Sequence, residues 1–337
     1  MSSTTSAPRS YPFAIANAFT QDVFGGNPAT IIFLNPSDTL TQEERLKFAK
    51  GFNQPMVVFL TPTSTSVNKQ EVVSFDIQYF TSSHEIDICG HGTIAAMKVV
   101  LDSAKETPGF GRGSQFPAFS SPETHTVEFT TAKGVVISAR KVVIEEEDWL
   151  EIVLPAGKVK DLPAEEEKRV LGVLARAMKK EPGVKYIGAG EPPFQDYLLI
   201  VLEESENLEQ LKLDIKALVG NSGLRFALTK TDDTWVLLVQ KETGFLVHVV
   251  TTDSTSGKFT EDYITRMFAP AAEVDEDHVC GSANCTMAPY WATQKGVTEL
   301  KVRQVSERGG KLRVGIDGDN IRVRGQVRVT SVGQLFL

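Results

Sequence analysis

The sequence contains little cysteine and none of the common signatures of metal or nucleotide sites. Three cysteines among 337 residues are too few for a disulfide framework. The metal signatures CxxC and HExxH are absent and the five histidines are scattered, so we predict no metal site. The signatures of dinucleotide and P-loop sites, GxGxxG and GxxxxGKS/T, are also absent, so we expect the protein to use no cofactor.

Long apolar runs and an excess of positive charge are missing as well. The apolar runs, such as residues 197–202, are far shorter than the roughly 18 residues that a membrane span needs. The net charge of −8 argues against a nucleic-acid partner. Residues 1–10 are rich in Ser and Thr and contain no apolar signal core. We therefore expect a cytoplasmic protein with neither a membrane nor a nucleic-acid partner.

What the sequence does contain is a mixture of many short strand-like runs and a few helical segments. Helices are expected at residues 41–51, 93–101 and 165–178 and in the stretch after Gly281. Strands are expected at residues 29–34, 56–60, 72–80, 134–139, 150–154, 197–202, 234–239 and 245–251. This pattern fits an α+β fold with mixed or antiparallel sheets better than a regular βαβ alternation.

The length of the chain predicts two domains. A boundary near residue 140 would leave two halves of comparable size. Residues 107–122 are rich in Pro, Gly and Ser and are predicted to form an exposed loop. The acidic residues 145–148 are predicted to form a solvated turn.

The two halves resemble each other around one dipeptide. Phe80 leads through an acidic stretch to Cys89-Gly90, and Phe268 leads through another to Cys280-Gly281. The distance from Phe to Cys is 9 residues in the first half and 12 in the second, a difference that a loop can absorb. A stretch of small and apolar residues follows each Cys-Gly. An internal duplication is the simplest explanation.

A Cys-Gly at the start of a buried helix has specific chemistry. The helix after Cys89 is apolar nearly all round, so we expect it to be buried with a sheet around it. A cysteine in its first turn would lie beside unpaired N–H groups and the positive end of the helix dipole, which favour the thiolate. The same N–H groups suit a substrate carboxylate. Two such helix starts facing each other would place two acid/base groups on opposite faces of one substrate carbon.

A lone cysteine is more often a small buried apolar residue than a catalytic one. We keep that interpretation for Cys285, which lies inside a helical stretch. Cys89 and Cys280 are assigned as the acid/base pair because they occupy the same place in a repeated unit. His91 and Asp277 flank them and are expected to contact substrate. Three other histidines are expected to be structural or solvated: His84, His125 and His248.

Three segments of the sequence resemble the phenazine-biosynthesis PhzF-like family, within the wider diaminopimelate-epimerase-like fold. They are residues 18–28, 79–93 and 276–283. The resemblance implies two pseudo-symmetric domains, each a mixed β-sheet wrapped around a central helix, with the last strand returning to the first domain. The expected domains are therefore residues 9–140 plus 325–337, and residues 141–324.

The departures from the family pattern concern the catalytic groups. Met56 stands where the family has its catalytic Glu, and a thioether cannot carry a proton. Asn17 stands where Asp is usual. Cys280 replaces a Thr, which creates a cysteine pair like that of diaminopimelate epimerase and of proline racemase, whose first motif also reads CGHG. Loss of one base and gain of another imply a changed mechanism.

We predict a cofactor-independent epimerase, racemase or double-bond isomerase that acts on a small carboxylate-bearing substrate, with Cys89 and Cys280 as acid and base. The residues expected to bind that substrate are Asn27, Gly90, His91, Gly92, Asp277, Gly281 and Ser282. Two alternatives stay open. One is a PhzF-like isomerase with Asp277 or His91 as the base, and the other is a non-catalytic protein that binds a metabolite or a protein partner. A homodimer is a further expectation.

Overall fold

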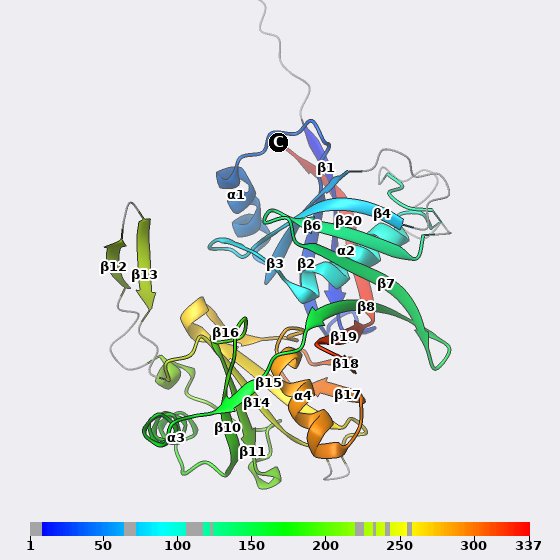
Figure 1. Cartoon of the computed structure of the whole chain (residues 1–337). Helices are drawn as coiled ribbons and strands as arrows, with labels where there is room; N and C mark the ends of the chain where they lie inside the picture. The colour runs from blue at the N-terminus through cyan, green and yellow to red at the C-terminus, as the bar shows by residue number, and fades with distance from the viewer. Residues whose placement is uncertain are drawn as a thin grey trace, which may run out of the picture. The chain divides into compact units, whose positions relative to one another are not determined.

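The computed structural model describes residues 9–63, 72–105, 117–121, 124–219, 226–231, 234–239, 243–254 and 258–337, and it consists mainly of strands (Figure 1). The α-helices of the described chain are α1 (Gln42–Phe52), α2 (Gly90–Asp102), α3 (Ala164–Met178) and α4 (Asn284–Lys295). All four helical predictions are confirmed, and so is the mixed α and β class. No helix of the described residues is both long and apolar enough to cross a membrane.

The chain divides into two compact units, which we call unit 1 (Met1–Val153 and Arg324–Leu337) and unit 2 (Leu154–Val323). The predicted boundary at residue 140 falls inside strand β7 (Val136–Ile144), which pairs along its length with β8 (Glu147–Pro155). Unit 1 therefore continues to Val153. The two residues of the β7–β8 turn, Glu145 and Glu146, are exposed at φ 52° and 67°, which confirms a solvated turn there.

Unit 1 is one mixed sheet whose strand order is β20–β1–β2–β3–β4–β6–β7–β8. The pairs β2–β3 and β4–β6 are parallel, and each needs a crossover, which α1 and α2 supply. Because β20 pairs with β1, the first and last strands of the chain lie in the same unit. The further strands of this sheet are β1 (Ser10–Ala18), β2 (Asn27–Phe33), β3 (Met56–Pro62), β4 (Val72–Phe80), β6 (Thr126–Thr131) and β20 (Val327–Phe336).

Helix α2 is the central helix of unit 1. Every residue of it except Gly90 and Lys98 is buried. It contacts strands β1, β2, β3, β6, β7 and β20, which lie around it (Figure 1). The expectation of a buried helix surrounded by a sheet is confirmed, and its cause is the nearly continuous run of apolar residues, which leaves no face for water.

Unit 2 repeats this order of pairings. Its sheet runs β9–β10–β11–β14–β15–β17–β18. From β20 in unit 1 and from β9 in unit 2, the first six ladders are in turn antiparallel, antiparallel, parallel, antiparallel, parallel and antiparallel. The strands are β9 (Val159–Asp161), β10 (Val184–Gly190), β11 (Tyr197–Leu202), β14 (Val247–Asp253), β15 (Tyr263–Ala269), β17 (Glu299–Gln304) and β18 (Gly310–Asp317).

The elements around the two Cys-Gly dipeptides also correspond. A short strand pairs antiparallel with the strand before it in each unit: β5 (Glu85–Ile86) with β4, and β16 (Val274–Asp277) with β15. A helix then crosses to the next parallel strand, α2 to β6 and α4 to β17. This common order is the pattern that an internal duplication produces.

The remaining elements lie outside this common core. In unit 2, α3 buries its apolar face against a cluster that includes Leu198, Ile200 and Leu202 of β11. Strands β12 (Phe226–Thr231) and β13 (Thr234–Val239) form a separate antiparallel hairpin, and β19 (Asn320–Gly325) leads into β20. Most of the predicted loop at residues 107–122 lies outside the described residues.

Candidate active site

Cys89 is the N-cap residue of α2. Its backbone is extended, with φ −143° and ψ 113°, and its sulfur accepts a hydrogen bond from the Gly92 N–H at 3.4 Å. The sulfur thus takes one of the N–H groups that a helix start leaves without a backbone partner. The predicted place of this cysteine is confirmed, and the contact favours its thiolate form.

His91 lies beside the sulfur of Cys89. Its Nδ1 is 3.2 Å from Sγ and its Nε2 is 4.0 Å away. Both residues are buried, at 8% exposure each. An imidazole within hydrogen-bond reach of a thiol can take up or return its proton. The structure thus shows a direct contact between His91 and Cys89, and the expected contact of His91 with substrate stays a prediction.

Two buried hydroxyl groups in series hold the backbone carbonyl of Cys89. Thr93 donates through Oγ1 to the Cys89 oxygen at 2.7 Å, and the Tyr79 hydroxyl lies 2.6 Å from the same Oγ1. Because Thr93 donates to the carbonyl, its hydroxyl accepts from Tyr79. Burial raises the pKa of Tyr79 far above its usual value, which keeps this phenol protonated as the donor.

Met56 packs against the first turn of α2. A Cβ added at Gly92 would lie 3.1 to 3.3 Å from the side chains of Val58, Met56 and Tyr79, so glycine permits this close packing. Met56 itself is 3% exposed. Met56, which stands where the resemblance implies a Glu, therefore lies beside Gly92 in the first turn of the helix that follows Cys89.

The two asparagines near the start of the chain are buried in the same unit. Asn17 donates through Nδ2 to the Val23 carbonyl at 2.9 Å. Asn27 opens β2 and pairs in register with Ala18 of β1. The predicted contact between Asn27 and substrate stays a prediction.

Cys280 does not occupy the helix position that we expected. Helix α4 begins only at Asn284, so Cys280 precedes it by one turn. The N–H groups of Asn284, Cys285 and Thr286 bond to the carbonyls three residues before them, at 3.0 to 3.3 Å. The prediction of a cysteine in the first turn of the α-helix is therefore wrong for unit 2. A turn with hydrogen bonds between residues three apart separates Cys280 from the helix.

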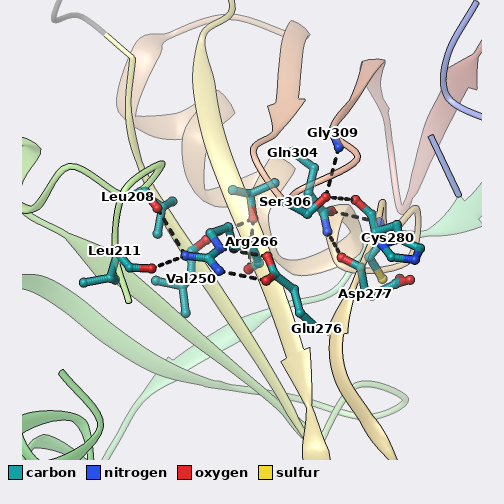
Figure 2. A network of polar contacts seen from close by, with 12 residues as sticks. Leu208, Leu211, Val250, Arg266, Glu276, Asp277, Cys280, Gln304, Ser306 and Gly309 are labelled. Carbon is teal, nitrogen blue, oxygen red and sulfur yellow. Dashed lines mark hydrogen bonds and ion pairs between the residues drawn. The ribbon is translucent and has the colours of Figure 1, made fainter. Parts of the chain in front are cut away.

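The loop that carries Cys280 is fixed by the end of β17. The Cys280 N–H donates to Gln304 Oε1 at 2.8 Å, and Gln304 Nε2 donates to the Asp277 carbonyl at 2.6 Å, as Figure 2 shows. Ser306 donates to the carbonyl of His278. Sequence reasoning missed Gln304. The available signal was a Gln in phase with Leu300 and Val302 on a strand whose other inward residues are apolar.

The sulfur of Cys280 lies next to hydroxyl groups. Its Sγ is 3.4 Å from Ser282 Oγ, which is in turn 3.1 Å from the hydroxyl of Tyr197 on β11. Burial and the neighbouring Cys280 both raise the pKa of Tyr197, which therefore stays protonated. The structure thus brings the predicted residue Ser282 to Cys280 and adds Tyr197, which the sequence had not indicated.

The carbonyl of Cys280 is held in the same way as that of Cys89. Asn284 donates through Nδ2 to the Cys280 oxygen at 3.0 Å, and the Tyr263 hydroxyl donates to Asn284 Oδ1 at 2.7 Å. Asn284 follows Cys280 by four residues, as Thr93 follows Cys89. Each unit therefore fixes its cysteine backbone through a buried tyrosine and the side chain four residues after the cysteine.

Neighbouring ionisable groups have structural partners. Glu276 makes two bonds of 2.7 Å with the guanidinium of Arg266, which also donates to the Leu211 carbonyl (Figure 2). Cys285 is 1% exposed, and burial raises its pKa, in line with its structural assignment. His248 is buried with Nε2 2.6 Å from Thr243 Oγ1. Among the described residues, no three His, Cys, Asp or Glu side chains gather in a metal-binding group.

The sequence matches a family described as phenazine biosynthesis-like protein over residues 16–334. An uncharacterized isomerase of Halalkalibacterium halodurans is 26% identical over 97% of this chain and 98% of its own length. A phenazine biosynthesis-like domain-containing protein of Homo sapiens is 26% identical over 96% of this chain and 98% of its own. Each is similar to this chain over nearly its full length.

Solved structures share the fold. A phenazine biosynthesis protein of the PhzF family from Enterococcus faecalis has a TM-score of 0.69 at 24% identity, covering 98% of this chain and 100% of that one. A hydroxyproline epimerase from Agrobacterium vitis, solved with trans-4-hydroxy-L-proline, has a TM-score of 0.51 at 11% identity, covering 98% and 93%. The same fold therefore occurs in PhzF proteins and in an epimerase.

Proposed function

The chain belongs to the phenazine biosynthesis-like protein family, and from this membership we propose that it is an isomerase that moves a proton at the carbon next to a carboxylate in a small, amino-acid-like substrate. Curated relatives from two bacteria are named as isomerases. The finer part of the proposal, epimerisation or racemisation without a cofactor, comes from the two cysteines.

In this mechanism Cys89 and Cys280 are the two acid/base groups. One thiolate removes the proton from one face of the substrate carbon, and the other thiol delivers a proton to the opposite face. The negative charge that develops in between is spread onto the substrate carboxylate. The mechanism therefore requires the two sulfurs to reach opposite faces of one carbon when substrate is bound.

One observation carries this assignment. In each unit a Cys-Gly precedes the crossover helix, and the cysteine carbonyl is held by the side chain four residues later, which a buried tyrosine holds in turn. A cysteine that served only as apolar packing would need no such support. Two supports of the same design fit two cysteines that must each be held in a fixed position.

We assign the backbone amides near the two cysteines either to the Cys89 sulfur or to the substrate carboxylate. The Gly92 N–H already donates to the Cys89 sulfur, so we assign it to the thiolate rather than to the carboxylate. The proposed carboxylate donors are the amides of Gly90 and His91 in unit 1 and of Gly281 and Ser282 in unit 2. Fixed donors that meet developing negative charge supply a larger part of the rate than each proton transfer, which contributes roughly 10²- to 10⁴-fold.

A second candidate function is also that of an isomerase, but with a base other than the two cysteines. The 3.2 Å contact between His91 Nδ1 and Cys89 Sγ makes the imidazole a candidate for the group that finally holds the proton. Cys89 would then position His91, and Cys280 would be dispensable. Asp277 is the other candidate base, and its backbone is fixed by Gln304. A protein that only binds a metabolite is the outcome if no substrate exchanges its proton.

The test is deuterium exchange in D₂O, followed by proton NMR, with a panel of amino and hydroxy acids. The panel includes proline and trans-4-hydroxyproline because the Agrobacterium vitis epimerase, which has this fold, was solved with the latter. We expect loss of one α-proton signal with wild-type protein and none with Cys89→Ser or Cys280→Ser. Exchange that persists in both cysteine variants and disappears in His91→Gln would establish the second candidate. The absence of exchange across the panel would contradict an enzyme for substrates of this class.

A further inference from the structure

Unit 1 contains a groove that the proposed reaction does not use. Its volume is about 840 Å³, within the range of ligand pockets, and it lies between the C-terminal part of α2 and strands β7, β8 and β20. Cys89 is at the other end of the helix. Asp102, in the groove, is 13 residues further along α2, or about 20 Å at 1.5 Å per residue. The groove is therefore a separate feature.

One wall of the groove is the edge of a strand. Six consecutive residues of β20, 327–332, line it. Side chains alternate between the two faces of a strand, so a single face would contribute every second residue only. Thr330 is an extra residue opposite Ile15 and Ala16 and forms a bulge. This bulge does not explain why the other five residues line the groove. The groove therefore runs along the backbone edge of β20.

This edge carries no strand of the described residues. Among the described strands, β20 forms a ladder with β1 alone, so its other edge is left without a strand partner. An unpaired edge presents a row of backbone N–H and C=O groups, which an extended peptide can match. The length of six strand residues, about 20 Å at 3.3 Å each, suits an extended segment better than a small metabolite.

The charge of the lining indicates what kind of segment would fit. Four basic side chains face two acidic ones: Lys98, Lys105, Lys141 and Arg328 against Asp102 and Asp148. Asp102 is buried and pairs with Lys98 at 2.6 Å and with Lys105 at 2.8 Å, and Asp148 pairs with Lys141 at 2.8 Å, which leaves a net excess of two positive charges in the lining. An excess of positive charge in a chain whose net charge is −8 favours an acidic ligand. It also disfavours a second copy of this edge, which would bring its own arginine and lysines.

We propose that this groove binds an extended acidic segment of a partner protein, which adds a strand to the free edge of β20. Backbone pairing with β20 supplies the affinity, and the basic side chains select Glu or Asp at positions that face them. The proposal does not depend on the chemistry at Cys89 or Cys280.

The binding test uses the full chain and a defined probe, a fluorescein-labelled hexapeptide of alternating Glu and Val, followed by fluorescence anisotropy at low and physiological salt. We expect saturable binding that weakens as salt rises. A Lys-Val hexapeptide should bind at least about tenfold more weakly, because it places like charges together. The Glu-Val peptide with N-methyl groups on alternate amides should also lose at least about tenfold, because methylation removes strand pairing and keeps the charge.

A pair of matched variants locates the site. Arg328→Glu changes an exposed residue of β20, and Lys160→Glu changes an exposed residue of β9, the strand at the corresponding end of the unit 2 sheet. We expect Arg328→Glu to weaken peptide binding about tenfold or more and Lys160→Glu to change it less than about twofold. Thermal unfolding of both variants checks that the fold is intact.

Several outcomes would overturn the proposal. They are no binding of the Glu-Val peptide, equal binding of its N-methylated form, and equal effects of the two variants. Sedimentation of the unliganded protein provides a further check. If the chain forms dimers that Arg328→Glu dissociates and Lys160→Glu does not, a second copy occupies the edge and the partner segment is excluded.

Discussion

The surroundings of Cys89 and Cys280 are alike at the backbone and different at the sulfur. In both, a carbonyl accepts from a side chain four residues later, which a buried tyrosine holds. At the sulfur, Cys89 has an imidazole at 3.2 Å and a helix N–H at 3.4 Å, whereas Cys280 has the Ser282 hydroxyl at 3.4 Å. The two units thus fix the cysteine backbone in the same way, and the residues around each sulfur set its chemistry.

From this difference we expect the two thiols to have unequal roles at rest in the proposed mechanism. An imidazole and a helix N–H stabilise a thiolate, so Cys89 is the group that we expect to begin the reaction as the base. Ser282 and Tyr197 are hydroxyl groups, and Tyr197 keeps its proton because burial raises its pKa. Such neighbours suit a thiol that begins as the acid.

The largest expected effect is a loss of turnover that distinguishes Cys89 and Cys280 from Cys285. Cys89→Ser and Cys280→Ser should each lower turnover at least about 10³-fold, since a hydroxyl is a far poorer base than a thiolate. Cys285→Ser is the matched control, because it makes the same change inside α4, and it should alter turnover little. The assay is racemisation or α-proton exchange of whichever substrate the panel identifies. Full activity in either of the first two variants would remove that cysteine from the mechanism.

A smaller effect is expected from the two tyrosines, Tyr79 and Tyr263, that hold the side chains bonded to the cysteine carbonyls. Tyr263→Phe leaves the buried Asn284 Oδ1 without the hydroxyl donor shown for it, a loss of about 1 to 3 kcal/mol in the free energy of unfolding. Tyr79→Phe should cost less, about 1 kcal/mol, because the Thr93 hydroxyl still donates to the Cys89 carbonyl. Urea unfolding measures both, with Tyr290→Phe, which is only partly buried, as control. Equal losses would mean that the two supports are equivalent after all.

A substitution of Met56 tests whether unit 1 still uses the position at which the family has its catalytic Glu. Met56→Leu conserves the volume and apolar character of a buried residue that packs beside Gly92, so we expect a loss of stability below about 1.5 kcal/mol. The activity should change less than about tenfold, and mainly through the Michaelis constant rather than through turnover. A loss of turnover as large as that of the cysteine variants would show that the segment around residue 56 has been misread.

The smallest expected effect is a pH dependence of stability that arises from His278 in unit 2. Burial and the nearby Arg308 hold the pKa of His278 below its usual 6.5, against the opposite influence of Glu276 and Glu307. As the pH falls through 6.5, the unfolded chain takes up a proton that the folded chain does not, so this histidine lowers stability below that pH and has no effect above it. Urea unfolding between pH 5 and pH 8, roughly, should show a slope that His278→Gln reduces. An unchanged slope would assign the pH dependence to other groups.

The sequence predicted the four helices, eight of the strands and the two Cys-Gly positions, because these depend on local pattern. Apolar residues all round α2 indicated a buried helix, and the repeat pointed to Cys89 and Cys280. It could not predict the long-range partners. Gln304 meets Cys280 from a strand 24 residues later. Tyr263 reaches Asn284 across 21 residues.

One local prediction was also wrong for a physical reason. The same dipeptide precedes both helices, and we expected both cysteines in a first helical turn. In unit 2 the Gln304 side chain takes the Cys280 N–H, and a turn of i to i+3 bonds intervenes before Asn284. The Gln304 contact depends on β17, which follows the helix in the chain, and the dipeptide alone carries no sign of it.

The central claim is that two thiols serve one carbon, and the most direct test needs no substrate. Mild oxidation with diamide, followed by peptide mapping with and without dithiothreitol, reports which cysteines can meet. We predict a reversible disulfide between Cys89 and Cys280, since groups that serve opposite faces of one carbon must approach each other closely. Cross-linking of Cys280 to Cys285 alone, or thiols that stay free while activity is lost, would contradict the two-cysteine mechanism.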